Sequence, residues 1–204
     1  MKIIDFRLSR IKAKLKKPFI TNLRRVDTIE DVLVTLIADD GTVGYGEAPP
    51  TVAITGEDIE SIERSIGGRI FPALRGMRVD DDEIFEALGR SLAKNTSAKA
   101  CVDMAIYDLV SKKAKIPLWQ YLGGEQKTLK TNLTISLNDT ATMLKDAVSA
   151  YNDGFSILKV KVGEGEDESV EITRLIREHL PNAVIRLDAN QAWDPKKSVK
   201  IAER

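Results

Sequence analysis

The sequence predicts an α+β domain followed by α/β structure, the opening βα units of an incomplete (β/α)8, TIM-like barrel. Alternating apolar residues in the first fifty positions indicate antiparallel strands, and residues with helical spacing follow them. After Gly123 and Gly124, three short strand-like runs alternate with amphipathic helices, the order typical of parallel strands with crossover connections. We therefore place the α+β domain at residues 1–125 and the βα units at residues 126–204.

The elements of the first part follow from periodicity and turn residues. Apolar alternation predicts strands at Ile4–Leu8, Val32–Leu36 and Val43–Tyr45, with loops at residues 18–26 and 47–56. Helical spacing then predicts a helix from residue 59, one behind Asp80-Asp81-Asp82, and one that Ser97 caps. Cys101, the single cysteine, lies on the apolar stripe of that last helix and is expected to be a small core residue.

The second part alternates strands and helices. Strands are predicted at residues 131–136, 157–162 and 184–187. Helices are predicted at 140–152, ended by Gly154, at 170–178, and from Pro195 onward with Asp194 as the N-cap. A doubly wound sheet and a (β/α)8 barrel both fit this order. Lys161 follows Thr134 by 27 residues and Asp188 follows Lys161 by 27, a regular repeat that favours the barrel, whose units average about 30 residues.

Composition limits the classes of partner. Lys and Arg together number 31, as do Asp and Glu, so no net charge attracts the chain to nucleic acid or to an anionic membrane. The first twenty residues scatter lysines among apolar positions, unlike a signal peptide, and no apolar run is long enough to span a bilayer. We expect a cytoplasmic protein whose partners are small molecules or further copies of itself.

Three polar residues near strand ends are candidates for chemistry. Lys159 and Lys161 are two positions apart on a strand and so share one face, where burial and mutual repulsion favour the neutral amine that acts as a base. Asp188 ends the next strand, and its carboxylate suits Mg²⁺. The alternatives are solvated lysines on an exposed edge strand and a helix-capping aspartate.

The combination of these residues is specific. It consists of Lys-x-Lys on one strand and Asp-x-Asn on the next, and it resembles the muconate-lactonizing subgroup of the enolase superfamily. The resemblance covers essentially the whole chain. It rests on the runs Leu158-Lys159-Val160-Lys161-Val162-Gly163, Leu187-Asp188-Ala189-Asn190-Gln191-Ala192-Trp193, Gly44-Tyr45-Gly46-Glu47-Ala48, Ser97-Ala98-Lys99-Ala100, Ala105-Ile106-Tyr107-Asp108 and residues 118–124. It implies that the first domain is a capping domain and the second a truncated barrel.

Within that subgroup the chain is similar to dipeptide epimerases of the L-Ala-D/L-Glu type. The supporting runs are Thr21-Asn22-Leu23-Arg24, Pro49-Pro50-Thr51, Ile54-Thr55-Gly56 and Thr134-Ile135-Ser136. The resemblance implies an Mg²⁺-dependent 1,1-proton transfer at the α-carbon of the substrate's C-terminal residue, through an enediolate.

The resemblance also implies a role for each site residue. Lys161 would be an acid/base, Lys159 would assist electrostatically, and Asp188 would be the first of three Mg²⁺ ligands. Arg24, on a mobile capping loop, would contact the side-chain carboxylate of the dipeptide, and Thr134 would help to seat it. From the residues alone, a solvated surface cation is the favoured interpretation of Arg24, and β-propensity alone accounts for Thr134.

Several parts of such an enzyme would lie on later strands. They are a second lysine base, two acidic ligands and an Asp-x-Asp motif for the substrate's ammonium group. We therefore expect the 204-residue chain alone to be inactive. Separately, we expect the complete enzyme to be a homo-oligomer. Related o-succinylbenzoate synthases, N-acylamino-acid racemases and muconate cycloisomerases remain alternatives, as does a non-catalytic assembly module. Arg24 and the Thr134 segment favour the epimerase.

Overall fold

The computed structural model describes all residues, 1–204, which group into two compact units. The first unit comprises Met1–Ala13 and Ile29–Lys127, and the second comprises Lys14–Thr28 and Thr128–Arg204. The far end of the first hairpin, residues 14–28, thus belongs with the C-terminal segment. The domain division at residues 125 and 126 stays a prediction.

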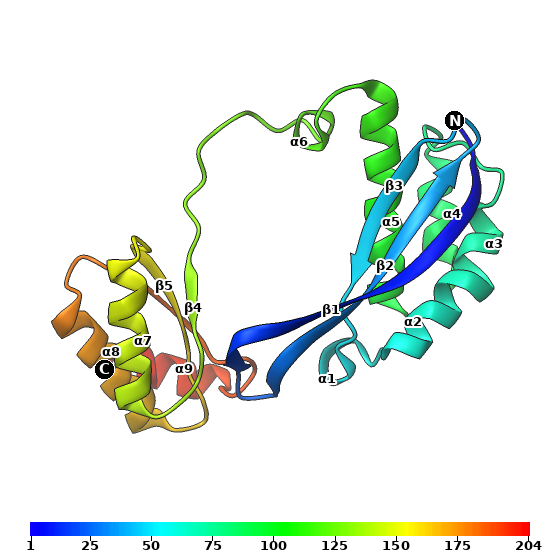
Figure 1. Ribbon diagram of the computed structural model, residues 1–204. Coiled ribbons are helices and arrows are strands. Elements are labelled where there is room, and N and C mark those ends of the chain that lie inside the picture. The colour runs from blue at the N-terminus through cyan, green and yellow to red at the C-terminus, as the bar shows by residue number, and fades with distance from the viewer. The chain divides into compact units, whose positions relative to one another are not determined.

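The first unit contains a three-stranded sheet of order β1-β2-β3 (Figure 1). Its strands are β1 (Ile3–Ile20), β2 (Arg25–Ala38) and β3 (Val43–Ala48), of which residues 14–20 of β1 and 25–28 of β2 fall in the second unit. β2 and β3 pair antiparallel, with Val34 opposite Gly46, which confirms the antiparallel pairing predicted for this region.

The two loops predicted in this part are shorter in the structure. Only residues 21–24 separate β1 from β2, because Pro18 is accommodated within β1, an edge strand that can do without the proline's missing N–H. In the second predicted loop, β3 runs on to Ala48, and α1 (Val52–Thr55) adds one helical turn.

Helices cover one face of this sheet (Figure 1). α2 (Ile59–Ser65), the π-helical segment η1 (Ile66–Ile70) and α3 (Phe71–Leu74) follow one another without a break. α4 (Glu83–Ser91), α5 (Thr96–Ala114) and α6 (Leu118–Tyr121) complete the unit. Their apolar faces and the inward side chains of β2 form one buried core, which includes Cys101 as predicted.

The contact between β3 and α5 depends on two glycines. A Cβ atom added to Gly46 would lie 1.8 Å from the Cys101 carbonyl oxygen, and one added to Gly44 would lie 2.2 Å from the Ala105 carbonyl oxygen. Only glycine allows the strand backbone to approach the helix backbone this closely.

The N-terminus of α5 is capped from a distance. Glu57 is only 3% exposed, and its carboxylate accepts the Ser97 N–H at 2.8 Å and the Ala98 N–H at 3.1 Å. The prediction that Ser97 caps this helix is therefore wrong: α5 begins at Thr96, and a carboxylate 40 positions upstream satisfies the free N–H groups that a local cap would take.

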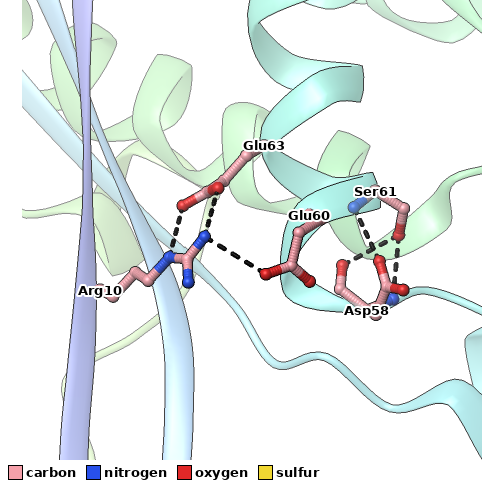
Figure 2. A network of polar contacts seen from close by, with 5 residues as sticks. All are labelled: Arg10, Asp58, Glu60, Ser61 and Glu63. Carbon is pink, nitrogen blue, oxygen red and sulfur yellow. Dashed lines mark hydrogen bonds and ion pairs between the residues drawn. The ribbon is translucent and has the colours of Figure 1, made fainter.

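An ion-pair network joins β1 to α2 at the surface (Figure 2). The Arg10 guanidinium donates to both Glu63 oxygens, at 2.8 and 2.7 Å, and approaches Glu60 at 3.5 Å. In the adjacent turn, Asp58 caps α2 by accepting the Ser61 N–H at 2.7 Å. The Arg10 side chain is half exposed, so water and salt screen this network and it contributes little stability.

The second unit contains a parallel sheet of order β4-β5-β6. Its strands are β4 (Leu133–Ile135), β5 (Ile157–Lys161) and β6 (Val184–Asp188), and its helices are α7 (Thr140–Asn152), α8 (Glu166–His179) and α9 (Pro195–Ala202). This confirms the predicted alternation of parallel strands and helices.

Two predicted helix signals in this unit are present as expected. Gly154 follows α7 with φ of 96°, and the Asp194 side chain caps α9 by accepting the Lys197 N–H at 2.7 Å. The unit has its own buried core, formed mainly by Ile135, Leu158 and Val160 packed against α7 and α8. Across the chain, none of the helices combines the length and apolar character that a bilayer span requires.

Candidate active site

The register of the parallel sheet places the predicted polar residues on one face. Thr134 on β4 pairs with Lys159 on β5, and Lys161 on β5 pairs with Asp188 on β6. Because side chains alternate along a strand, these residues point away from the buried face that Leu158 and Val160 form with the helices. Lys161 and Asp188 both end their strands, so they meet at the carboxyl edge of the sheet, where parallel α/β folds bind their ligands.

The two lysines meet at a single carboxylate oxygen. Lys161 Nζ lies 2.7 Å from Asp188 Oδ2, and Lys159 Nζ lies 2.8 Å from the same atom. The Lys161 side chain is only 6% exposed, whereas that of Lys159 is 38% exposed. The expected alternative, an edge strand with solvated lysines, does not apply, because β5 is the central strand and Lys161 is buried.

The ammonium groups change the acidity of Asp188. Partial burial alone would raise the pKa of this carboxyl, but hydrogen bonds from Lys159, Lys161 and the Asn190 N–H outweigh burial and hold the pKa well below its usual value. Asp188 is therefore an anion at neutral pH, which is the form that binds a divalent cation.

The residues after Asp188 form a tight turn that sequence reasoning did not exploit. Asn190 and Gln191 have φ of 45° and 67°, in the left-handed region, and the Asn190 N–H donates to Asp188 Oδ1 at 3.0 Å. The Asn190 side-chain oxygen is buried and has no hydrogen-bond partner. The Asp-x-Asn run in the sequence could have indicated that Asn190 lies beside Asp188.

The donor set fits Mg²⁺ in kind but is incomplete in number. Asp188 offers a carboxylate, and the unpaired Asn190 oxygen is a second hard donor nearby in sequence. No group of three or more His, Cys, Asp or Glu residues in the chain is arranged to hold a metal ion. A bound Mg²⁺ would thus need acidic ligands besides Asp188.

Arg24 lies in a closed turn between β1 and β2. The Thr21 N–H donates to the Arg24 carbonyl at 2.9 Å, and Thr21 Oγ1 accepts the N–H groups of Leu23 and Arg24 at 3.2 and 3.3 Å. Thr21 is 8% exposed, so its hydroxyl stabilises the turn from within. This local network fixes the backbone from which the Arg24 side chain extends.

The same turn lies next to the lysine site within the second unit. The Leu137 N–H, just beyond β4, donates to the Ile20 carbonyl at 3.0 Å. The Phe19 ring lies 5.7 Å from Lys161 Nζ, within the range of a cation–π interaction. Sequence reasoning missed Phe19, because no local pattern in the chain links a residue before the turn to a lysine on β5.

Models of two protein families match the chain. The family described as "Mandelate racemase / muconate lactonizing enzyme, N-terminal domain" matches residues 3–123, and "Enolase C-terminal domain-like" matches residues 142–204.

The chain is also similar to individual relatives. The L-Ala-D/L-Glu epimerase of Bacillus subtilis is 45% identical over 203 residues, covering 98% of this chain and 55% of the relative. The structure of a substrate-liganded complex of the L-Ala-D/L-Glu epimerase from Bacillus subtilis matches with a TM-score of 0.95 at 42% identity, covering 100% of this chain and 57% of that one. A dipeptide epimerase from Enterococcus faecalis, complexed with Mg and L-Leu-L-Tyr, matches with a TM-score of 0.94 at 35% identity. The match covers 100% of this chain and 58% of that one. The chain thus spans little more than half the length of these relatives.

Proposed function

Because the chain belongs to the mandelate racemase / muconate lactonizing enzyme family, we propose that it forms part of an Mg²⁺-dependent dipeptide epimerase of the L-Ala-D/L-Glu type. The observation that carries this proposal is the convergence of Lys159 and Lys161 on Asp188 at the carboxyl edge of a parallel sheet. The relatives named above are epimerases of dipeptides, and one of them was solved with Mg and a dipeptide.

The proposal extends to the fold. β4 to β6 with α7 to α9 would be the opening units of a (β/α)8 barrel, and residues 1–125 would form the capping domain. The regular 27-residue repeat from Thr134 to Lys161 to Asp188 supports the barrel. The homo-oligomer and the cytoplasmic location stay predictions.

In the proposed reaction, Lys161 exchanges a proton with the α-carbon of the dipeptide's C-terminal residue. Bound Mg²⁺ would stabilise the negative charge that develops on the substrate carboxylate. Asp188 would hold the cation, and Lys159 would add a positive charge on the same face of the sheet. Burial suits Lys161 to this role, since little water competes with the substrate for contact with its amine.

Two residues would contact the substrate away from the reacting carbon. Arg24 would bind the side-chain carboxylate of an acidic C-terminal residue, and its turn lies against the sheet edge that holds Lys161. Thr134 pairs with Lys159 on the neighbouring strand and would help to seat the peptide. Inversion at the α-carbon also requires a base on the opposite face, which further barrel strands would provide.

The proposal is tested by α-proton exchange in D₂O with L-Ala-L-Glu, using the protein with a complete barrel. We expect Mg²⁺-dependent deuterium incorporation at the α-carbon of the glutamate together with formation of L-Ala-D-Glu. Exchange on N-acylated amino acids but on no dipeptide would reject the epimerase in favour of a racemase of the same family. Absence of exchange on every carboxylate offered would reject catalysis at this site.

A further inference from the structure

The turn that carries Arg24 is anchored by an ion pair that the proposed reaction does not use. Lys17, near the end of β1, places its Nζ atom 2.6 Å from Asp146 Oδ1 on α7. The two residues are 129 positions apart in the chain, and both belong to the second unit. The Lys17 side chain is 70% exposed and that of Asp146 27%, so the pair lies at the surface.

A second contact lies between this ion pair and the turn. The Leu137 N–H donates to the Ile20 carbonyl at 3.0 Å, so the backbone of β1 is also bound to the segment that follows β4. Lys17 and Ile20 are therefore two successive points at which the end of β1 is held. Thr21 then closes the turn through hydrogen bonds with the backbone of residues 23 and 24.

These contacts connect the Lys17 ion pair to the turn that carries Arg24. The strand from Lys17 to Ile20 is extended and paired, and the turn after it is closed, so the segment moves as one piece. Release of the Lys17 anchor would remove one of the contacts that hold the turn, beside the backbone bond at Ile20 and the contact between Phe19 and Lys161. The position of the Arg24 backbone relative to Lys161 therefore depends on the anchor.

We propose that Lys17 and Asp146 are positioning residues that hold the Arg24-bearing turn at the carboxyl edge of the β4–β6 sheet. The importance of this position for substrate choice rests on the proposed function, whereas the anchoring itself does not. A surface ion pair has a modest effect, so the pair shifts the balance between a docked and a released turn and does not lock it.

The first test follows the amide of Leu137 in the 204-residue chain by hydrogen exchange and NMR, because this N–H is protected only while the turn is docked. Asp146→Asn should speed its exchange about two- to fivefold, as should Lys17→Gln. The charge-reversed pair K17D/D146K should restore slow exchange. The Val160 amide, within the central strand β5, should be unchanged in every variant, which shows that the sheet remains folded.

Two controls separate the anchor from general charge effects. Glu178→Gln breaks a comparable exposed ion pair, Arg174–Glu178 on α8, and should leave Leu137 exchange unaltered. In 1 M salt, where the screening length is about 3 Å, the difference between wild type and Asp146→Asn should disappear. Equal Leu137 exchange in wild type and Asp146→Asn at low salt, with Val160 protected, would overturn the proposal.

A kinetic measurement on the protein with a complete barrel tests the consequence for the substrate. Asp146→Asn should raise KM for L-Ala-L-Glu about two- to fivefold with little change in kcat, and K17D/D146K should reverse the change. Faster Leu137 exchange in Asp146→Asn, with no dipeptide turnover even in wild type, would support the anchor and reject the proposed function. Dipeptide turnover in wild type, with unchanged Leu137 exchange in Asp146→Asn, would support the proposed function and reject the anchor.

Discussion

The Lys161 ammonium nitrogen lies 2.7 Å from Asp188 Oδ2, although the two residues are 27 positions apart in the chain. The parallel register of β5 and β6 brings them together, since Lys161 and Asp188 are direct partners across the strands. One βα repeat therefore places a candidate base beside a candidate metal ligand, and the contact can be tested directly.

Lys161→Ala, in the protein with a complete barrel, should lower kcat for epimerisation at least about 100-fold in both directions, because net inversion requires both bases. Deuterium incorporation from solvent into one epimer should survive through the opposite base, as measured by NMR of each pure epimer. Lys200→Ala, which removes an exposed lysine on α9, is the control and should leave both rates unchanged. Unaltered epimerisation in Lys161→Ala would remove this residue from the mechanism.

Arg24→Ala should change the choice of substrate more than the chemistry. Loss of a charged hydrogen bond worth about 1.5–3 kcal/mol should lower kcat/KM for L-Ala-L-Glu roughly 10- to 100-fold relative to L-Ala-L-Leu. Arg25→Ala is a matched control, because it removes the neighbouring guanidinium, which donates to Asp27 at 2.9 and 3.1 Å. If the ratio between the two dipeptides were the same in Arg24→Ala and wild type, Arg24 would have no part in recognition.

Gly46→Ala should destabilise the first unit. The new methyl group would lie 1.8 Å from the Cys101 carbonyl, so β3 and α5 must move apart, at a cost of about 1–3 kcal/mol or more. Gly89→Ala provides the contrast, since Gly89 lies within α4 with no atom near its missing Cβ, and alanine there should add about 0.5–1 kcal/mol. Urea denaturation followed by far-UV circular dichroism measures both, and equal midpoints for the two variants would contradict the close approach.

Alkaline pH should destabilise the chain through Cys101. Burial raises the pKa of this thiol to about 12 in the folded state, whereas an exposed thiol has a pKa of 9.0. Between these values the unfolded state releases a proton that the folded state retains, so stability falls by up to about 1.4 kcal/mol per pH unit as pH rises above 9. From pH 8 to pH 10, wild type should lose about 1.4 kcal/mol more unfolding free energy than Cys101→Ala. Parallel losses in the two proteins would show that the thiol is accessible to solvent.

The 204-residue chain alone should bind Mg²⁺ only weakly, in the millimolar range or above. Asp188 is one carboxylate, already paired with two ammonium groups, and Mg²⁺ gives up its hydration water reluctantly unless several oxygens are fixed around it. Calorimetric titration with Mg²⁺ measures the affinity, and L-Ala-L-Glu exchange is assayed on the same sample. A micromolar dissociation constant together with turnover would show that these residues suffice for the enzyme.

Local patterns were reliable where one segment carries all the information. The apolar spacing in residues 140–152, followed by Gly154, predicts α7 at its observed bounds, and the Asp194-Pro195 pair predicts the start of α9. The placement of Lys159 and Lys161 on one face follows from the two-residue period of a strand. Their pairing with Asp188 needed in addition the regular repeat of parallel strands.

Only the tertiary structure decided how distant segments meet. Glu57 replaces Ser97 as the cap of α5, and Lys17 pairs with Asp146. Residues 14–28, which include the end of β1 and the start of β2, belong with the C-terminal unit. Each of these contacts joins residues at least 40 positions apart, and hydrophobic periodicity describes only neighbours within a few turns or strand positions. The sequence by itself therefore determined the elements and the chemistry of each strand end, whereas the folded chain determined which helix ends, turns and charges share a site.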